Sequence, residues 1–179
     1  MKKILTVLLA VSLAAAMTAC GAGNVGGSSS ASASSGAASQ SSSSQAASSA
    51  PSASSYDNTL DGLEKYLTAN SVISGSPTAM QAAFIGAKSG AKYQFGLNGN
   101  NNVTVELYEF DPSSLNDTAK TVQADVKSKG SFTIMSQQVN AVLSDSGKFL
   151  MIYKDTVTNN DQNKSRQQQT EKLVKEFQK

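Results

Sequence analysis

A long run of small, uncharged residues, from Gly21 to Ser55, decides where this chain can fold. The run is almost entirely serine, alanine and glycine, with no charged or aromatic side chain and no apolar period. Such a segment buries too little surface to offset the conformational entropy that folding removes. We therefore expect residues 20–55 to be a disordered spacer with a root-mean-square span of roughly 30 Å. Residues 56–179 are left to form a single domain, which is long enough for a sizeable core.

The residues that precede the spacer have the pattern of an export signal. Lys2 and Lys3 come before a mostly apolar run, Ile4 to Met17. This run is shorter than the roughly 20 residues that span a bilayer, and it ends in small residues. The next segment, Met17-Thr18-Ala19-Cys20-Gly21, resembles the lipobox of bacterial lipoproteins, with methionine in place of the more usual leucine.

The lipobox resemblance implies that residues 1–19 are a lipoprotein signal peptide, cut between Ala19 and Cys20. It also implies that Cys20 carries a diacylglycerol thioether. Two acyl chains are the minimum for durable attachment, because one chain holds a protein only marginally. Cys20 would then anchor the chain to the outward-facing side of the cell membrane, in the cell envelope. The alternative is ordinary secretion with cleavage at an A-x-A-like site, in which case Cys20 would have no role in anchoring.

Composition narrows the functions that the domain can have. Loss of Lys2 and Lys3 with the signal leaves 13 basic and 13 acidic residues, and no basic stripe is present. Nucleic acid is therefore not an expected partner. The chain has no histidine, and Cys20 is its one cysteine. It lacks the commonest general base and metal ligand, and it has no cysteines for an internal disulfide or a zinc site. We expect a monomer with no catalytic residues, no cofactor and no bound metal.

Apolar periodicities in residues 56–179 predict an α+β domain. Helical spacing predicts helices near 60–67, 77–87 and 115–126 and at the C-terminal end. Alternation predicts strands at 91–97, 103–108, 132–143 and 148–153, with a hairpin turn at Asn98-Gly99. Phe149–Tyr153 is apolar on both faces, which indicates a central strand. The order α-α-β-β-α-β-β-α predicts a single antiparallel sheet of about four strands, packed by helices on one face.

Few side chains are candidates for chemistry. Glu106 and Glu109 have an odd separation, so they face opposite sides of a strand and cannot form a catalytic pair; solvated strand charges are expected. The loop Asn159–Asn163 has oxygen-bearing side chains at alternate positions, as a calcium loop does. The glycine that a calcium loop requires is Lys164 here, and the glutamate is Thr170. We therefore expect a polar loop that leads into a helix.

Three aromatic residues are the candidates for a binding surface: Tyr93, Tyr108 and Phe110. Tyr108 and Phe110 are predicted to lie on the face opposite Val105 and Leu107. An exposed aromatic strip on a sheet could bind a glycan or a peptide. The alternative is that these side chains pack beneath helices, with the tyrosine hydroxyl groups at the rim.

The whole layout resembles a group of small, uncharacterised lipoproteins of gut-dwelling, low-GC Gram-positive bacteria. These proteins join a lipobox and a Ser-rich spacer to a compact C-terminal domain. The segments Ile85–Tyr93 and Val105–Asp111 are similar to segments of that group. The resemblance implies no activity, so no catalytic role is transferred to this chain.

We therefore expect a membrane-anchored, non-enzymatic envelope lipoprotein that displays a binding domain for a protein or a wall polymer. Two alternatives remain open. One is an accessory ligand-binding subunit of a membrane transporter or sensor, which a deep apolar pocket with converging polar groups would favour. The other is a small envelope hydrolase, which needs an acid pair or a Ser–Lys pair brought together by folding.

Overall fold

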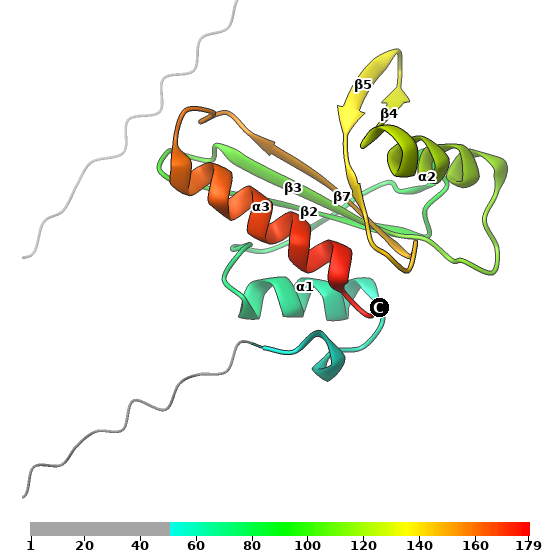
Figure 1. The fold of residues 1–179 in the computed structure, drawn as a ribbon, viewed down its shortest axis with the longest axis horizontal. Coiled ribbons are helices and arrows are strands. Elements are labelled where there is room, and N and C mark those ends of the chain that lie inside the picture. Colours follow the sequence, from blue (N-terminus) through cyan, green and yellow to red (C-terminus); the bar gives the residue numbers. More distant parts are fainter. Residues whose placement is uncertain (1–50) are drawn as a thin grey trace, which may run out of the picture. The chain divides into compact units, whose positions relative to one another are not determined.

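The computed structural model describes residues 51–179. The predicted signal, the lipid site at Cys20 and nearly all of the predicted spacer lie outside the described residues. Residues 51–179 form an α+β domain with a five-stranded antiparallel sheet, a separate two-stranded hairpin and three α-helices (Figure 1). The predicted fold class is confirmed.

The helices are α1 (Leu60–Ala69), α2 (Asp117–Lys129) and α3 (Asp161–Glu176), with short 3₁₀ turns at η1 (Ala53–Ser55) and η2 (Ala83–Ile85). In spatial order, the strands of the main sheet are β1 (Thr78–Ala79), β2 (Ser89–Phe95), β3 (Val103–Glu109), β7 (Phe149–Asp155) and β6 (Val142–Leu143). The separate hairpin consists of β4 (Ser131–Ile134) and β5 (Gln137–Asn140).

Helices cover both faces of the main sheet. On one face, side chains of α1 and α3 pack against the odd-numbered residues of the central strands, such as Val105 and Met151. On the other face, side chains of α2 belong to one cluster with Tyr108 and Leu150. Figure 1 shows α1 and α3 on one side of the strands and α2 on the other. The prediction that all helices lie on one face is wrong, because a strand that is apolar on both faces needs cover on both.

Capping side chains define where the helices begin and end. Thr59 accepts a hydrogen bond from the backbone of Gly62 at the start of α1, and Asn116 accepts one from Ala119 at the start of α2. Asn160 caps α3 by accepting from two backbone N–H groups, which confirms the predicted polar loop before a helix. α2 stops at Gly130, as predicted, in the left-handed conformation typical of helix ends.

The predicted helix over 77–87 is wrong. Thr78 and Ala79 pair with β2 instead, and a single 3₁₀ turn follows them. Gly86 ends this turn with φ of 74°. A Cβ atom at Gly86 would overlap the Asn116 side chain and the backbone of Ala119, at the start of α2. The close approach of α2 and the left-handed backbone together stop a helix that the apolar spacing alone would allow.

Gly86→Ala should destabilise the domain by about 3 kcal/mol, because the left-handed backbone costs about 1–2 kcal/mol and the collision with α2 adds to it. Gly130→Ala is the matched control. Gly130 is also left-handed, at φ of 66°, but a Cβ there would meet no atom within 4 Å, so about 1 kcal/mol should be lost. Urea denaturation of both variants measures the difference. Equal losses would contradict the proposed role of the contact with α2.

The predicted strand over 132–143 is divided into β4, β5 and β6. Met135 and Ser136 have φ of 47° and 64°, so the chain reverses between them and forms a two-residue hairpin turn. Such turns usually contain asparagine and glycine, and Met-Ser gives no comparable signal. The Met135 side chain at the tip is 90% exposed. Because the chain folds back here, only Val142 and Leu143 pair with β7 in the main sheet.

A polar network joins the β2–β3 turn to the start of α3. The carboxylate of Asp155 accepts hydrogen bonds from Asn102 at 2.7 Å and from Asn163 at 2.6 Å. Burial alone would raise the pKa of Asp155, but these bonds and one from the backbone of Val157 outweigh it and lower the pKa below its usual value of 3.8. Asn163 also donates to the backbone of Leu97, in the turn. The network therefore holds two distant loops together.

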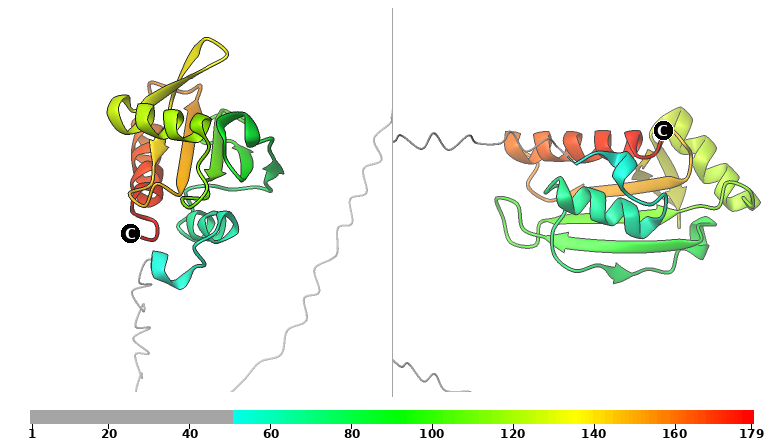
Figure 2. Two further views of the ribbon diagram at one scale, coloured as in Figure 1. Left: turned by 90° about the vertical axis from the view of Figure 1, so that its right-hand side faces the viewer. Right: turned by 90° about the horizontal axis from the view of Figure 1, so that it is seen from below.

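The C-terminal residues close the domain against its first described residues. The ring of Phe177 packs against Tyr66 of α1 at 5.3 Å between centroids and against Phe149 of β7 at 5.4 Å. The side chain of Gln178 donates hydrogen bonds to the backbone oxygens of Ala53 and Tyr56. Both views in Figure 2 show the C-terminus beside this N-terminal segment.

Candidate functional site

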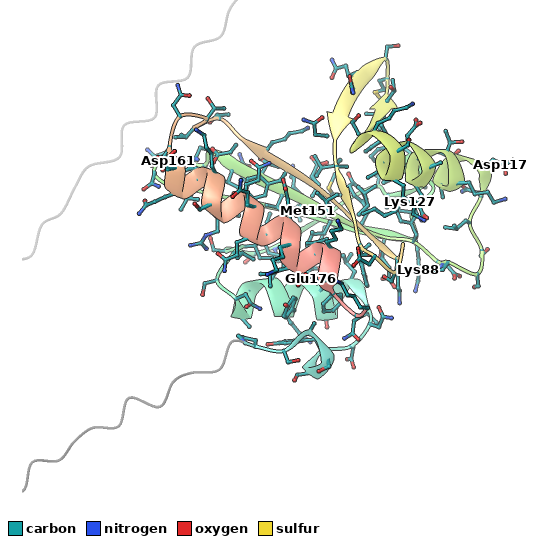
Figure 3. The ribbon with its side chains drawn as sticks, in the orientation of Figure 1. Lys88, Asp117, Lys127, Met151, Asp161 and Glu176 are labelled. Carbon is teal, nitrogen blue, oxygen red and sulfur yellow. The ribbon has the colours of Figure 1, made fainter. Side chains whose placement is uncertain are left out.

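A groove lies beside the edge strand β6, between α2 and α3. Its volume is about 570 Å³, which is within the range of known ligand sites. Figure 3 labels Lys127 on α2, Met151 on β7 and Glu176 on α3, the elements around β6. Apolar side chains and lysines dominate its lining, which includes Val126, Lys127, Val142, Leu143, Lys172 and Lys175.

The groove exposes a free stretch of sheet edge. The Lys148 oxygen accepts from Phe110 on the β3 side, and the Phe149 oxygen accepts from Ser144 on the β6 side. Antiparallel strands alternate the direction of their backbone groups. The N–H and C=O groups of Leu143 therefore point away from β7, toward the groove. Within residues 51–179, these two backbone groups of Leu143 form no hydrogen bond.

The unpaired part of the sheet edge is short, because backbone hydrogen bonds occupy both of its ends. At one end, the N–H of Ala141 donates to the oxygen of Gly130, just after α2, at 2.9 Å. At the other end, the N–H of Asp145 donates to the oxygen of Lys175, in the last turn of α3, at 2.9 Å. Leu143 lies midway between these bonds. It is 8% exposed as a whole residue, and it lines the groove.

A second hollow of about 260 Å³ adjoins the groove and shares Ala141, Val142 and Glu171 with it. Tyr153 lines this hollow. Its hydroxyl group is buried and has no hydrogen-bond partner among the described residues. Burial, together with the nearby carboxylates of Asp155 and Glu171, raises the pKa of Tyr153 to about 12. The hydroxyl therefore stays protonated at neutral pH and is free to donate a hydrogen bond.

The groove has a net positive charge, because its lining holds three lysines and two carboxylates. Lys127, Lys172 and Lys175 form no ion pair within the described part of the chain. Of the two carboxylates of the lining, Asp145 pairs with Lys179 at 3.0 Å, whereas Glu171 accepts a hydrogen bond at 2.7 Å from the neutral amide of Gln167 and keeps its charge. The free lysine charges favour an anionic ligand.

The groove is not predictable from the sequence. Lys127 lies near the end of α2, whereas Lys172 and Lys175 are on α3, which the chain reaches only after the four strands β4 to β7. No motif or spacing links residues so far apart. The signal that existed was indirect: a short strand between two helices leaves a sheet edge uncovered.

The predicted aromatic strip is not exposed. Tyr108 and Phe110 are completely buried, and Tyr93 is 4% exposed. The alternative holds instead, because all three pack in the cores and the two hydroxyl groups bind carboxylates at the rim. Tyr93 donates to Glu64 at 2.5 Å, and Tyr108 donates to Glu106 at 3.1 Å.

Glu109 is buried, so the prediction of a solvated strand charge is wrong for this residue. Its side chain is 7% exposed and lies 3.4 Å from the ammonium group of Lys148. It also accepts hydrogen bonds from the backbone of Leu60 at 3.2 Å and from the Ser89 hydroxyl at 3.3 Å. Because Leu60 is the first residue of α1, Glu109 attaches the start of this helix to the sheet. Its surroundings indicate a structural role.

Replacing Glu109 should weaken the domain. Glu109→Leu removes the acceptor for Leu60 and Ser89 and leaves Lys148, which is 20% exposed, without its partner. We expect the free energy of unfolding to fall by about 2–4 kcal/mol. Glu109→Gln keeps an acceptor and should lose about half as much. Chemical denaturation tests this order, and a fully stable Leu variant would exclude the proposed attachment.

Comparison of the chain with protein-family models, curated proteins and solved structures finds no match. In the part of the chain that the structure describes, no helix is long and apolar enough to cross a membrane. Among these same residues, no three acidic or cysteine side chains gather as a metal site. The function must therefore be argued from the residues themselves.

Proposed function

We propose that this chain is a membrane-anchored lipoprotein of the cell envelope whose domain is a binding module, not an enzyme. Cys20 carries the lipid anchor, and the Ser-rich segment between Cys20 and the domain is the spacer that carries the domain away from the membrane. The predicted boundary at residue 55 is too late, because η1 (Ala53–Ser55) belongs to the domain. The groove between α2 and α3 is the surface that contacts a protein or a wall polymer. The observation that carries this assignment is the free sheet edge at Leu143 with three unpaired lysines beside it.

The shape of the site favours a chain segment over a small solute. The groove lies between two helices, and the adjoining hollow extends the groove. The lysines at its sides supply charge, which serves recognition. Among the carboxylates considered for catalysis, Glu106 and Glu109 belong to opposite faces of β3, so they cannot act on one bond.

Cys20→Ala should release the protein from the membrane, because the thiol that receives the lipid is lost. Immunoblots of membrane and medium fractions measure the release, and mass spectrometry of the wild-type N-terminus measures the lipid. Cys20→Ser, which also lacks the thiol, should behave like the alanine variant. Membrane retention of both variants would contradict the lipid anchor.

A photo-crosslinker in the groove should capture the ligand in living cells. Lys172→p-benzoylphenylalanine places the reactive group in the groove lining. Lys154→p-benzoylphenylalanine is the matched control, because Lys154 is an exposed lysine of β7 that forms no ion pair within residues 51–179. Ultraviolet light should give a discrete adduct, of protein or polymer, from position 172 and none from position 154. Absence of an adduct at position 172 would contradict the proposed contact surface.

A further inference from the structure

We propose that the ligand of this groove is a short, extended, acidic peptide segment of a partner protein, one residue of which pairs with the backbone of Leu143. The inference rests on the proposed binding function and specifies its ligand. It follows from the free backbone groups of the groove, from the positions of its lysines, and from the buried hydroxyl of Tyr153 in the adjoining hollow.

The backbone groups favour a peptide over an anionic polymer. Leu143 offers one donor, its N–H, and one acceptor, its C=O, and both face the groove. A residue of an antiparallel strand satisfies both groups at once, because it also presents one N–H and one C=O. A phosphate polymer offers oxygen acceptors, so it would satisfy the N–H and leave the C=O of Leu143 without a donor. Tyr153, whose hydroxyl lacks a partner, adds a donor next to the groove.

The positions of the lysines define the ligand sequence. The side chain of Leu143 lies on the α2 face of the sheet, and that of Val142 lies on the α3 face. A ligand residue opposite Leu143 therefore points its side chain toward α2, where Lys127 is located. Its two neighbours point toward α3, where Lys172 and Lys175 are located. Three consecutive acidic residues match the three lysines, whereas an alternating acidic pattern would reach one helix only.

The chain's own spacer does not match this requirement. Residues 21–55 contain no aspartate or glutamate, so they cannot pair with the lysines. The occupant is therefore a segment of another protein. The free edge is bounded by the Ala141–Gly130 and Asp145–Lys175 hydrogen bonds, so the segment needs few residues in the extended conformation.

The test uses the full-length chain in detergent and the fluorescein-labelled peptide Ser-Gly-Glu-Glu-Glu-Gly-Ser, with binding measured by fluorescence anisotropy. A second peptide carries an N-methyl group on the central glutamate. This group removes the hydrogen-bond donor for Leu143 and leaves the charge unchanged. We expect the unmodified peptide to bind, and the N-methylated peptide to bind at least about tenfold more weakly, a change typical of one lost hydrogen bond to a buried acceptor.

Charge variants test the lysines. Lys127→Glu combined with Lys172→Glu should weaken binding at least about tenfold, because each change replaces an attraction by a repulsion. Lys154→Glu, the same change outside the groove, should leave binding unchanged. Circular dichroism confirms that these surface variants remain folded. Equal loss for the groove and control variants would overturn the proposal.

Two further outcomes would overturn the peptide assignment without affecting the proposed function. The N-methylated and unmodified peptides could bind equally well, which would show that charge alone attracts them. Polyphosphate could bind in a way that depends on Lys127 and Lys172 while neither peptide binds, which would show a polymer site. The photo-crosslinker at position 172 would still give an adduct in the polymer case, whereas failure of the binding function itself would give none.

Discussion

The two-sided burial of β7 is the constraint on which the rest of this domain depends. Its residues Phe149–Tyr153 are all buried, with alternate side chains directed to opposite faces of the sheet. Each face then needs its own cover, which α1 and α3 provide on one side and α2 on the other. Because the covering helices flank the sheet from both sides, an edge strand between them lies at the bottom of a groove. The candidate site is thus a direct result of the core.

The groove also depends on the turn at Met135 and Ser136. If residues 132–143 formed one continuous strand along β7, as their alternation suggests, the paired edge would be longer and its course different. The reversal at this turn confines the pairing with β7 to Val142 and Leu143. Gly130 and Lys175 then occupy the two ends of the remaining edge. A local turn therefore sets how much backbone a ligand can reach.

Local sequence patterns correctly predict the helices and strands whose formation depends on neighbouring residues alone. The spacing of Leu60, Leu63 and Leu67 predicted α1, and the alternating residues around Asn98-Gly99 predicted the β2–β3 hairpin. The errors lie where distant residues decide. Gly86 stops a helix because α2 packs against it. Glu109 is buried because Lys148 and the start of α1 neutralise and bind it. The lysines of the groove were not foreseen, because they meet only in the folded chain.

The contacts of Phe177 and Gln178 have a consequence for the order of events during biogenesis. A polypeptide emerges from the ribosome, or from an export channel, with its N-terminal end first. Here α1 emerges early, whereas its packing partner Phe177 and the Gln178 side chain that binds the backbone of Ala53 emerge only after α3. The domain therefore cannot complete its core until these two residues have emerged. Until then, α1 lacks its aromatic contact with Phe177, and the segment 53–56 lacks its hydrogen bonds to Gln178.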